Sequence, residues 1–255
     1  MVAPIQKTIA EELFGSVNAF IAEAAYLQED SLEIKRFLRQ ASQLMSINPT
    51  EANIAKAMIY QLCRNVDKVK DHVRIANQLP ALNKTLVYVN SSISLSNLGI
   101  YSEAQNYFSL VTEPNEVEPY LIIDTAFGCL SLQKLRLLLT RAKEMNLHFS
   151  DKDIELTSRA TEVMNKYKIT DSDLAKYADV FGEVLRENNF MIKSRFPDVV
   201  VGDKTNSWYP ETIFVIFKID SDAKTAAKLY KESVRRLLAG FDDIPDAVHF
   251  SIEAY

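Results

Sequence analysis

Apolar residues recur at helical spacing along the first 150 residues of the chain. Ala104, Phe108 and Val111 follow the spacing i, i+4, i+7, which places all three on one face of a helix. The same spacing recurs at intervals of 31 to 35 residues on either side. The recurring sets are Ile34, Leu38 and Ala41; Val69, Val73 and Ala76; and Leu135, Leu139 and Ala142. This periodicity predicts four helix pairs whose first helices span roughly 17–28, 50–62, 82–97 and 116–130.

The third unit carries the clearest motif. Gly99 stands at a turn, Tyr101 follows it, and Ala104 is followed four residues later by Phe108. This order of small and aromatic residues resembles the second helix of a tetratricopeptide (TPR) repeat, in which a small side chain lets two helices approach closely. The resemblance covers roughly residues 16–146, with one good unit and three degenerate ones. It implies a TPR-like α-α superhelix; the alternative is an irregular helical bundle with hairpins of similar length.

The resemblance also implies a groove lined by the first helix of each pair. Transferring the family's groove positions to this chain gives a mostly apolar strip. Its candidate partner-binding residues are Tyr26, Ile54, Met58, Leu62, Leu86, Val89, Ile93, Tyr120 and Phe127. An apolar strip of this length favours association. We therefore expect either a partner's peptide or helix to occupy the groove, or the chain's own residues 151–189 to fill it.

The period changes from 3.6 to 2 towards the C-terminus. Two more helices are predicted, one at 151–167 with an Asp/Ser-rich cap region at 150–153, and one that the sequence 170–173 caps and that stops at 187–189. Strands are then predicted at 190–193, 198–201, 212–219 and 248–255, with a helix that ends at Gly240 before the last one. The run 212–219 is typical of a central strand buried on both faces. The expected fold is mainly α, with a helical domain at 1–187 and a small β-β-β-α-β domain at 188–255, in which the crossover helix places the last strand parallel to 212–219 or beside it.

Composition excludes several classes of function. The chain has 255 residues and six glycines, and no two glycines form a GxG sequence, so dinucleotide-binding and Walker loops are excluded. The net charge of −5 disfavours nucleic acid as the main ligand. Cys63 and Cys129 are distant in sequence and fit a reducing compartment. No export signal and no long apolar run is found, so we expect a cytoplasmic protein that does not span a membrane.

Candidate catalytic chemistry is sparse. His72, His148 and His249 fall in different predicted elements, and no carboxylate or cysteine stands at metal-ligand spacing from them. Pro197-Asp198 resembles the start of the PD-(D/E)xK nuclease motif, in which two carboxylates hold Mg²⁺ and a lysine follows. Here the second acid position is Ile216, two residues before Lys218. We expect no cofactor and no metal.

A polar loop at 203–211 contains Trp208 and Tyr209, residue types that often anchor interfaces. Together these patterns favour a non-catalytic protein-protein interaction scaffold or regulator that binds a partner peptide or helix through an apolar groove. The first alternative is an antitoxin or immunity-type protein that neutralises a basic toxic enzyme. The second is a degenerate PD-(D/E)xK-like nuclease. A homo-oligomer is compatible with each of them.

Overall fold

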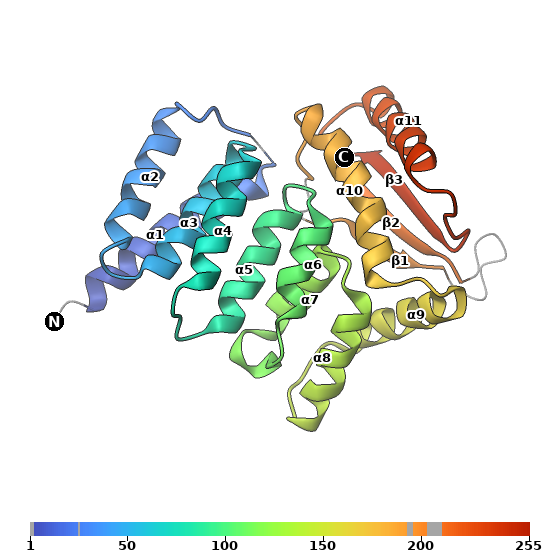
Figure 1. Cartoon of the computed structure of the whole chain (residues 1–255), viewed down its shortest axis with the longest axis horizontal. Coiled ribbons are helices and arrows are strands. Elements are labelled where there is room, and N and C mark those ends of the chain that lie inside the picture. Colours follow the sequence, from blue (N-terminus) through green and yellow to red (C-terminus); the bar gives the residue numbers. More distant parts are fainter. Residues whose placement is uncertain (1–2, 25, 193–195, 203–210) are drawn as a thin grey trace.

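The structure is a computed structural model that describes residues 3–24, 26–192, 196–202 and 211–255. These residues form eleven α-helices, three β-strands and a short 3-10 helix at Pro114–Glu116. Helices occupy the left and centre of Figure 1, and the strands gather at the right with the C-terminal part of the chain. The chain is therefore mainly α with a small C-terminal α/β unit, which confirms the predicted fold class.

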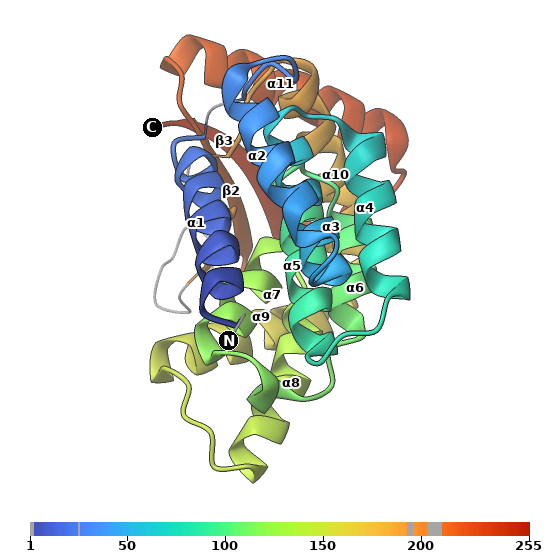
Figure 2. The same cartoon turned by 90° about the vertical axis from the view of Figure 1, so that its left-hand side faces the viewer.

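The first eight helices follow one another as four hairpins (Figures 1 and 2). The first members are α1 (Ala3–Ala22), α3 (Pro49–Leu62), α5 (Lys84–Ser96) and α7 (Pro119–Gly128). The second members are α2 (Leu32–Leu44), α4 (Val66–Gln78), α6 (Tyr101–Ser109) and α8 (Leu132–Glu144). Each first member also contacts the first member of the next hairpin, so the hairpins stack in chain order.

The residues of the four periodic sets lie inside this stack. Ten of the twelve are buried, and Leu38 and Leu139 are half-buried. The first helix differs from its expected position, because α1 begins at Ala3 and ends at Ala22 instead of spanning 17–28. Its residues Leu13, Val17 and Ile21 continue one apolar stripe and share a core cluster with α2 and α3. This cluster is the physical reason for the shift.

Helix α10 (Asp171–Glu187) ties several hairpins together. The carboxylate of Asp179 accepts hydrogen bonds from the backbone amides of Tyr101 and Ser102 at the start of α6. Eight residues earlier, the Asp171 carboxylate accepts from the amides of Gln133 and Lys134 at the start of α8. Neither α6 nor α8 has a side-chain cap of its own. Helix α10 therefore supplies the N-terminal caps that the local sequence lacks.

The sheet is three-stranded, with the order β1-β2-β3. β1 (Asp198–Val201) runs antiparallel to β2 (Ile213–Ile219), and β3 (Val248–Ala254) runs parallel to β2. The parallel placement confirms the expected crossover. Two expectations were wrong: in the predicted strand 190–193, the described residues 190–192 contribute only an isolated bridge at Ile192, and alternate residues of β2 are only half-buried. β2 is thus fully covered on one face.

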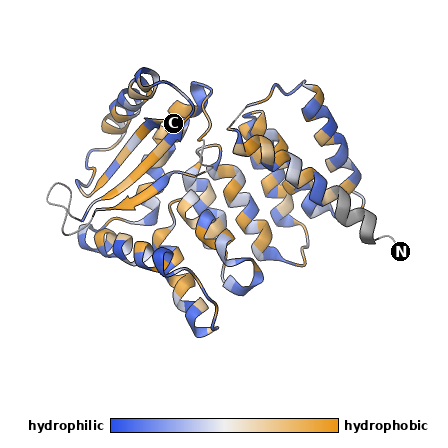
Figure 3. Cartoon of the chain, turned by 180° about the vertical axis from the view of Figure 1, so that it is seen from behind, coloured by the Kyte–Doolittle hydropathy of each residue, from blue (hydrophilic) through white to orange (hydrophobic). Residues whose placement is uncertain are grey.

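The covered face of the sheet packs against α10 and α11 (Ala223–Gly240). The ring of Phe181 on α10 stacks on Phe217 and Phe250, with ring centroids 5.4 and 5.2 Å apart. Figure 3 shows hydrophobic residues concentrated on the strands. Helix α9 (Asp151–Tyr167), α10 and the sheet share one core cluster, which therefore extends on both sides of residue 187.

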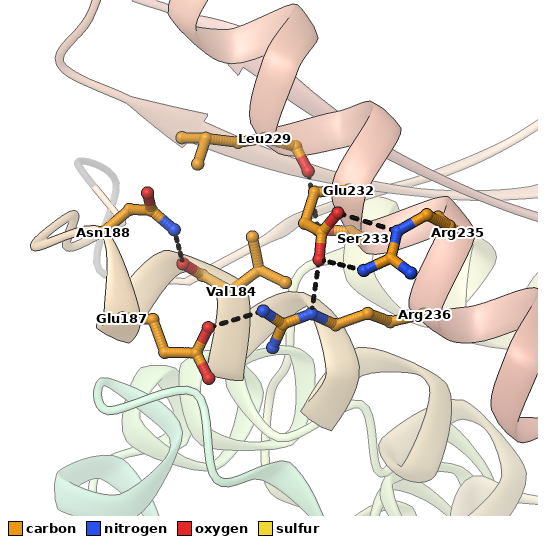
Figure 4. Close-up of polar contacts among 8 residues, drawn as sticks. All are labelled: Val184, Glu187, Asn188, Leu229, Glu232, Ser233, Arg235 and Arg236. Atoms are coloured by element: carbon orange, nitrogen blue, oxygen red, sulfur yellow. Dashed lines mark hydrogen bonds and ion pairs between the residues drawn. The ribbon is translucent and has the colours of Figure 1, made fainter.

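Ion pairs join α11 to α10 along one flank (Figure 4). Arg236 bridges Glu187 of α10 and Glu232 of its own helix, and Arg235 also contacts Glu232. This network fixes which flank of α11 faces α10. Within the described ranges, no helix combines the length and the apolar character that crossing a bilayer requires.

Candidate functional site

Four of the predicted groove residues are buried in the core. Ile54 and Met58 are 3% and 6% exposed, and Leu62 and Val89 are fully buried. Ile54, Met58 and Leu62 belong to the cluster that α1 completes with Leu13, Val17 and Ile21. Since α1 packs against α3, Met58 and Leu62 contact other parts of the chain and are not available to a partner. Ile54 keeps only a small exposed area, at the margin of a cleft described below.

The other predicted groove residues are distributed over several environments. Ile93 and Phe127 are half-buried against the core, whereas Leu86 and Tyr120 are 39% and 60% exposed. Tyr26 is half-buried; its hydroxyl donates to the carbonyl of Phe190, and burial raises its pKa to about 12. Trp208 and Tyr209 lie outside the described residues. The strip is therefore not one continuous surface.

Residues 151–189 make their main contacts away from the first helices of the hairpins, although Phe127 of α7 packs against the core cluster that α9 and α10 share with the sheet. Helix α9 contacts α8 and β1, and α10 contacts α6 and α11. The later helices thus lie against the second members of the hairpins and against the sheet. Ile54, Met58 and Leu62 instead share a core cluster with residues of α1 and α2.

An open cleft of about 630 Å³ lies at the edge of the stack, where α3 and α5 begin. We call it the edge cleft. Its lining comes from α1, from the loops before α3 and α5, and from the first two turns of those two helices. The lining residues are Phe14, Asn18, Ile47, Asn48, Pro49, Thr50, Glu51, Ile54, Pro80, Ala81, Leu82, Asn83, Leu86, Val87 and Asn90. Of the predicted groove residues, Ile54 and Leu86 are part of it.

Local capping explains how the walls of the edge cleft are held. The side chains of Asn48 and Asn83 accept hydrogen bonds from the amides of Glu51 and Leu86, and thereby start α3 and α5. The hydroxyl of Thr50 donates to the carbonyl of Pro80 at 2.9 Å. This bond ties the loop before α5 to the first turn of α3, so the cleft has two fixed walls.

Apolar side chains are unusually exposed in and beside the edge cleft. Leu82 is fully exposed at 111% of its reference area, and Ile47 is 40% exposed. Leu86 lies in the first turn of α5, four residues after Leu82 in the preceding loop, and both line the cleft. Exposed leucines that converge on a concave surface are typical of binding sites for apolar groups.

The edge cleft continues along the same margin of the stack. A second cleft of about 480 Å³ shares Asn83 and Leu86 with it and extends past Pro114 and Leu121 to Leu147. A third, of about 470 Å³, shares Leu147 and reaches Ile154 on α9. We call these three clefts together the band, and their linings include residues of the loops between α4 and α5, α6 and α7, and α8 and α9. These loops lie at the lower margin of Figure 1. The length of the band suits an extended chain better than a compact small molecule.

Charged residues are few in the edge cleft and the second cleft, and all of them are acidic. Glu51 is the charged residue that lines the edge cleft, and Glu116 and Glu118 line the second cleft. The remaining lining there is apolar or uncharged. Chemically, the first two clefts can bury apolar side chains, exchange hydrogen bonds through Asn side chains and attract a basic group, whereas Arg136 and Lys143 line the third cleft.

The exposed face of the sheet brings together part of the nuclease-like motif. The carboxylate of Asp198 on β1 lies 2.6 Å from the ammonium of Lys218 on β2, and this contact raises the pKa of Lys218. Ile216, at the second acid position, pairs with Asp198 in the register. Glu253 stands beside Lys218 on the opposite strand, so the lysine lies between two carboxylates. Asp198 therefore binds a lysine, and the paired carboxylates that would hold Mg²⁺ do not form here.

Over the residues that the structure describes, no group of three or more His, Cys, Asp or Glu side chains is arranged to hold a metal ion. His72 contacts the Asn53 side chain at 2.9 Å and stacks on Tyr60, and His249 stacks on Phe214. His72 and His249 thus lie in different elements, and each packs against an aromatic ring.

Sequence reasoning missed most of the edge cleft. The family's groove positions lie in the middle of the first helices, whereas Phe14, Ile47, Leu82 and Asn90 lie on α1, in loops or on another helix face. One signal was present in the sequence: apolar residues stand in the predicted loops at Ile47 and at Ala81-Leu82. No protein-family model, curated protein or solved structure matches the chain in comparisons with known proteins.

Proposed function

We propose that the protein is a non-catalytic interaction scaffold that binds an apolar segment of a partner protein in the edge cleft and along the band that continues it. The observation that carries this proposal is the convergence of exposed Leu82, Leu86 and Ile47 on one cleft with fixed walls. Burying such side chains contributes about 25 cal/mol per Å² of apolar surface removed from water.

The stacked hairpins support a TPR-like role for the helical part. In such arrays, neighbouring repeats build an extended binding surface, so a long ligand contacts several units at once. The band meets this description because its three clefts adjoin through Asn83, Leu86 and Leu147. The proposal moves the binding surface from the mid-helix positions to the edge where the first helices begin.

The charge of the first two clefts supports a basic group in the part of the partner that lies there, whereas Arg136, Lys143 and Asp151 line the third cleft. Glu51, Glu116 and Glu118 would favour Lys or Arg next to the apolar residues of the bound segment. The same observation favours our second candidate, a protein that neutralises a basic toxic enzyme. Free thiols at Cys63 and Cys129 support a reducing compartment.

Selection from a library of short random peptides displayed on phage tests this function. We expect enriched peptides to combine apolar residues with Lys or Arg, and to lose binding when Leu86 is replaced by Asp. Leu86→Asp removes an exposed apolar side chain from the cleft and should leave the fold intact. Leu238→Asp is the matched control, because Leu238 is also exposed and lies on α11, outside the band. Enriched peptides that bind both variants as well as they bind the unmodified chain would overturn the proposal, as would a selection without enrichment.

A further inference from the structure

The outer edge of β3 is an open strand edge. β3 is the last strand in the order β1-β2-β3, and its seven residues pair only with β2 in the described sheet. The amide of Tyr255 donates to Ile219, and the carbonyl of Ala247 accepts from Ile213. Odd-numbered residues therefore direct their backbone groups to β2. Phe250, Ile252 and Ala254 direct theirs outward, where they can pair with another strand.

This edge lacks the usual features that prevent strand addition. β3 contains no proline, no lysine and no bulge in its register with β2. Its inward side chains Val248, Phe250 and Ile252 are packed against the core and hold the strand in place. The edge is consequently both open and rigid.

Helix α11 presents an apolar flank next to the open edge of β3. Tyr230 and Leu238 are 41% and 67% exposed, and they lie on one side of the helix with Ala227 and Val234. The opposite flank carries Glu232 and Arg236, which face α10 (Figure 4). Helix α11 packs on β3, and its charged flank meets α10. The apolar flank of α11 therefore faces away from α10, outward past the open edge of β3. Figure 1 shows α11 and β3 at the outer margin of the molecule.

We propose that this edge and this flank form a two-fold interface with a second copy of the chain. Antiparallel pairing of two β3 strands would join the sheets into one of six strands, and the apolar flanks of the two α11 helices would meet above it. The backbone groups of Phe250 would pair with those of Ile252 in the second copy, and vice versa. Both residues direct their backbone N–H and C=O groups outward, as a hydrogen-bonded pair of an antiparallel ladder requires.

The charges on β3 argue for a second copy as the occupant. In this register Ser251 lies opposite Ser251 of the second copy, and His249 lies opposite Glu253. The two-fold axis repeats the His249–Glu253 pair on its other side. Both residues are exposed and lie on the uncovered face of the sheet. At such non-hydrogen-bonded positions the side chains approach most closely, and an imidazole N–H donates to a carboxylate in either charge state. Each interface would thereby extend the row of alternating charges formed by Asp198, Lys218 and Glu253.

Sedimentation velocity over a range of concentrations tests the proposal on the full chain. We expect a species of twice the 28.9 kDa chain mass. His249→Glu would place two carboxylates opposite each other and should weaken the dimer about tenfold. Adding Glu253→Arg to His249→Glu should restore dimerisation, because each pair then joins a carboxylate at position 249 to a guanidinium at position 253 of the other copy.

A second variant tests the helix flank independently of the strand. Leu238→Lys should also shift the equilibrium towards monomer, whereas the control Leu82→Lys should leave it unchanged because Leu82 lies at the edge cleft. Circular dichroism would verify that each variant keeps its helix content. A chain that sediments as a monomer at every concentration, or a dimer unaffected by both His249→Glu and Leu238→Lys, would overturn the proposal.

Discussion

The backbones of Gly99 and Gly182 lie in contact where the turn between α5 and α6 meets the middle of α10. A Cβ atom built on Gly182 would lie 2.2 Å from the carbonyl oxygen of Gly99, and one built on Gly99 would lie 2.5 Å from Cα of Gly182. Gly99 also has a φ of +67°, which favours glycine. This close approach is what brings Asp179 and Arg186 of α10 to the turn, where Arg186 donates to the Gly99 carbonyl.

Gly182→Ala should destabilise the fold by separating α10 from this turn. The methyl group would meet backbone atoms, which cannot rotate away, so we expect a loss of about 1–3 kcal/mol in the free energy of unfolding. Urea denaturation followed by circular dichroism measures this loss. Gly15→Ala is the matched control, because Gly15 lies in α1 with nothing within 4 Å of its added Cβ. An equal effect of the two substitutions would show that the contact at Gly182 is not needed.

The caps supplied by α10 predict a pH dependence of stability. Burial raises the pKa of Asp179, although the amide and hydroxyl groups of Ser102 and the amide of Tyr101 oppose the shift. A carboxyl group with a higher pKa in the folded state contributes stability below its unfolded pKa, and this contribution is lost as pH rises through the folded pKa. The unmodified chain should therefore lose stability relative to Asp179→Asn as pH rises from about 4, the unfolded pKa of aspartate.

Asp222 supplies a control of opposite sign. Its pKa is lowered because the backbone amide and hydroxyl of Thr225 donate to it at the start of α11. Its contribution to stability is present above the unfolded pKa and is lost as pH falls through the folded pKa. Chemical denaturation at a series of pH values measures both comparisons. Identical pH dependence for Asp179→Asn and Asp222→Asn would contradict the burial argument.

Ala104 tests the packing of the third hairpin. It is fully buried between α5 and α6 in a core cluster with Phe108 and Val69. Ala104→Leu should cost about 1–3 kcal/mol, since extra methylene groups in a packed core force its neighbours apart. Ala239→Leu is the control, because Ala239 is exposed on α11. A thermal melt that Ala104→Leu leaves unmoved would show that Ala104 does not stand at a helix crossing.

Hydrophobic spacing predicted the elements well because it depends on each segment alone. The helices at 50–62, 82–97 and 151–167 and the strand at 198–201 were placed within two residues of their observed ends. Spacing does not say which neighbour covers a given face. Ile54 and Met58 were predicted to line an open groove, yet they are buried in a core cluster that also contains Leu13 and Val17 of α1.

Contacts between distant segments account for the remaining differences. Asp171 and Asp179 bind backbone amides 38 and 78 residues earlier in the chain, and the spacing of residues within α10 does not specify such partners. The edge cleft likewise depends on three loops and α1 meeting at one place. The ion pair between Asp198 and Lys218 follows from strand register, which the unpaired sequence does not specify.

The most direct test of the proposed function is hydrogen–deuterium exchange of the chain with and without a peptide selected on it. Our account predicts slower exchange on binding at the loops and first turns that form the edge cleft, residues 47–54 and 80–90, and at Leu147 for a peptide that spans the band. Exchange should not change on the outer flank of α11 or on β3. Protection confined to α11 and β3, with none along the edge cleft, would contradict it.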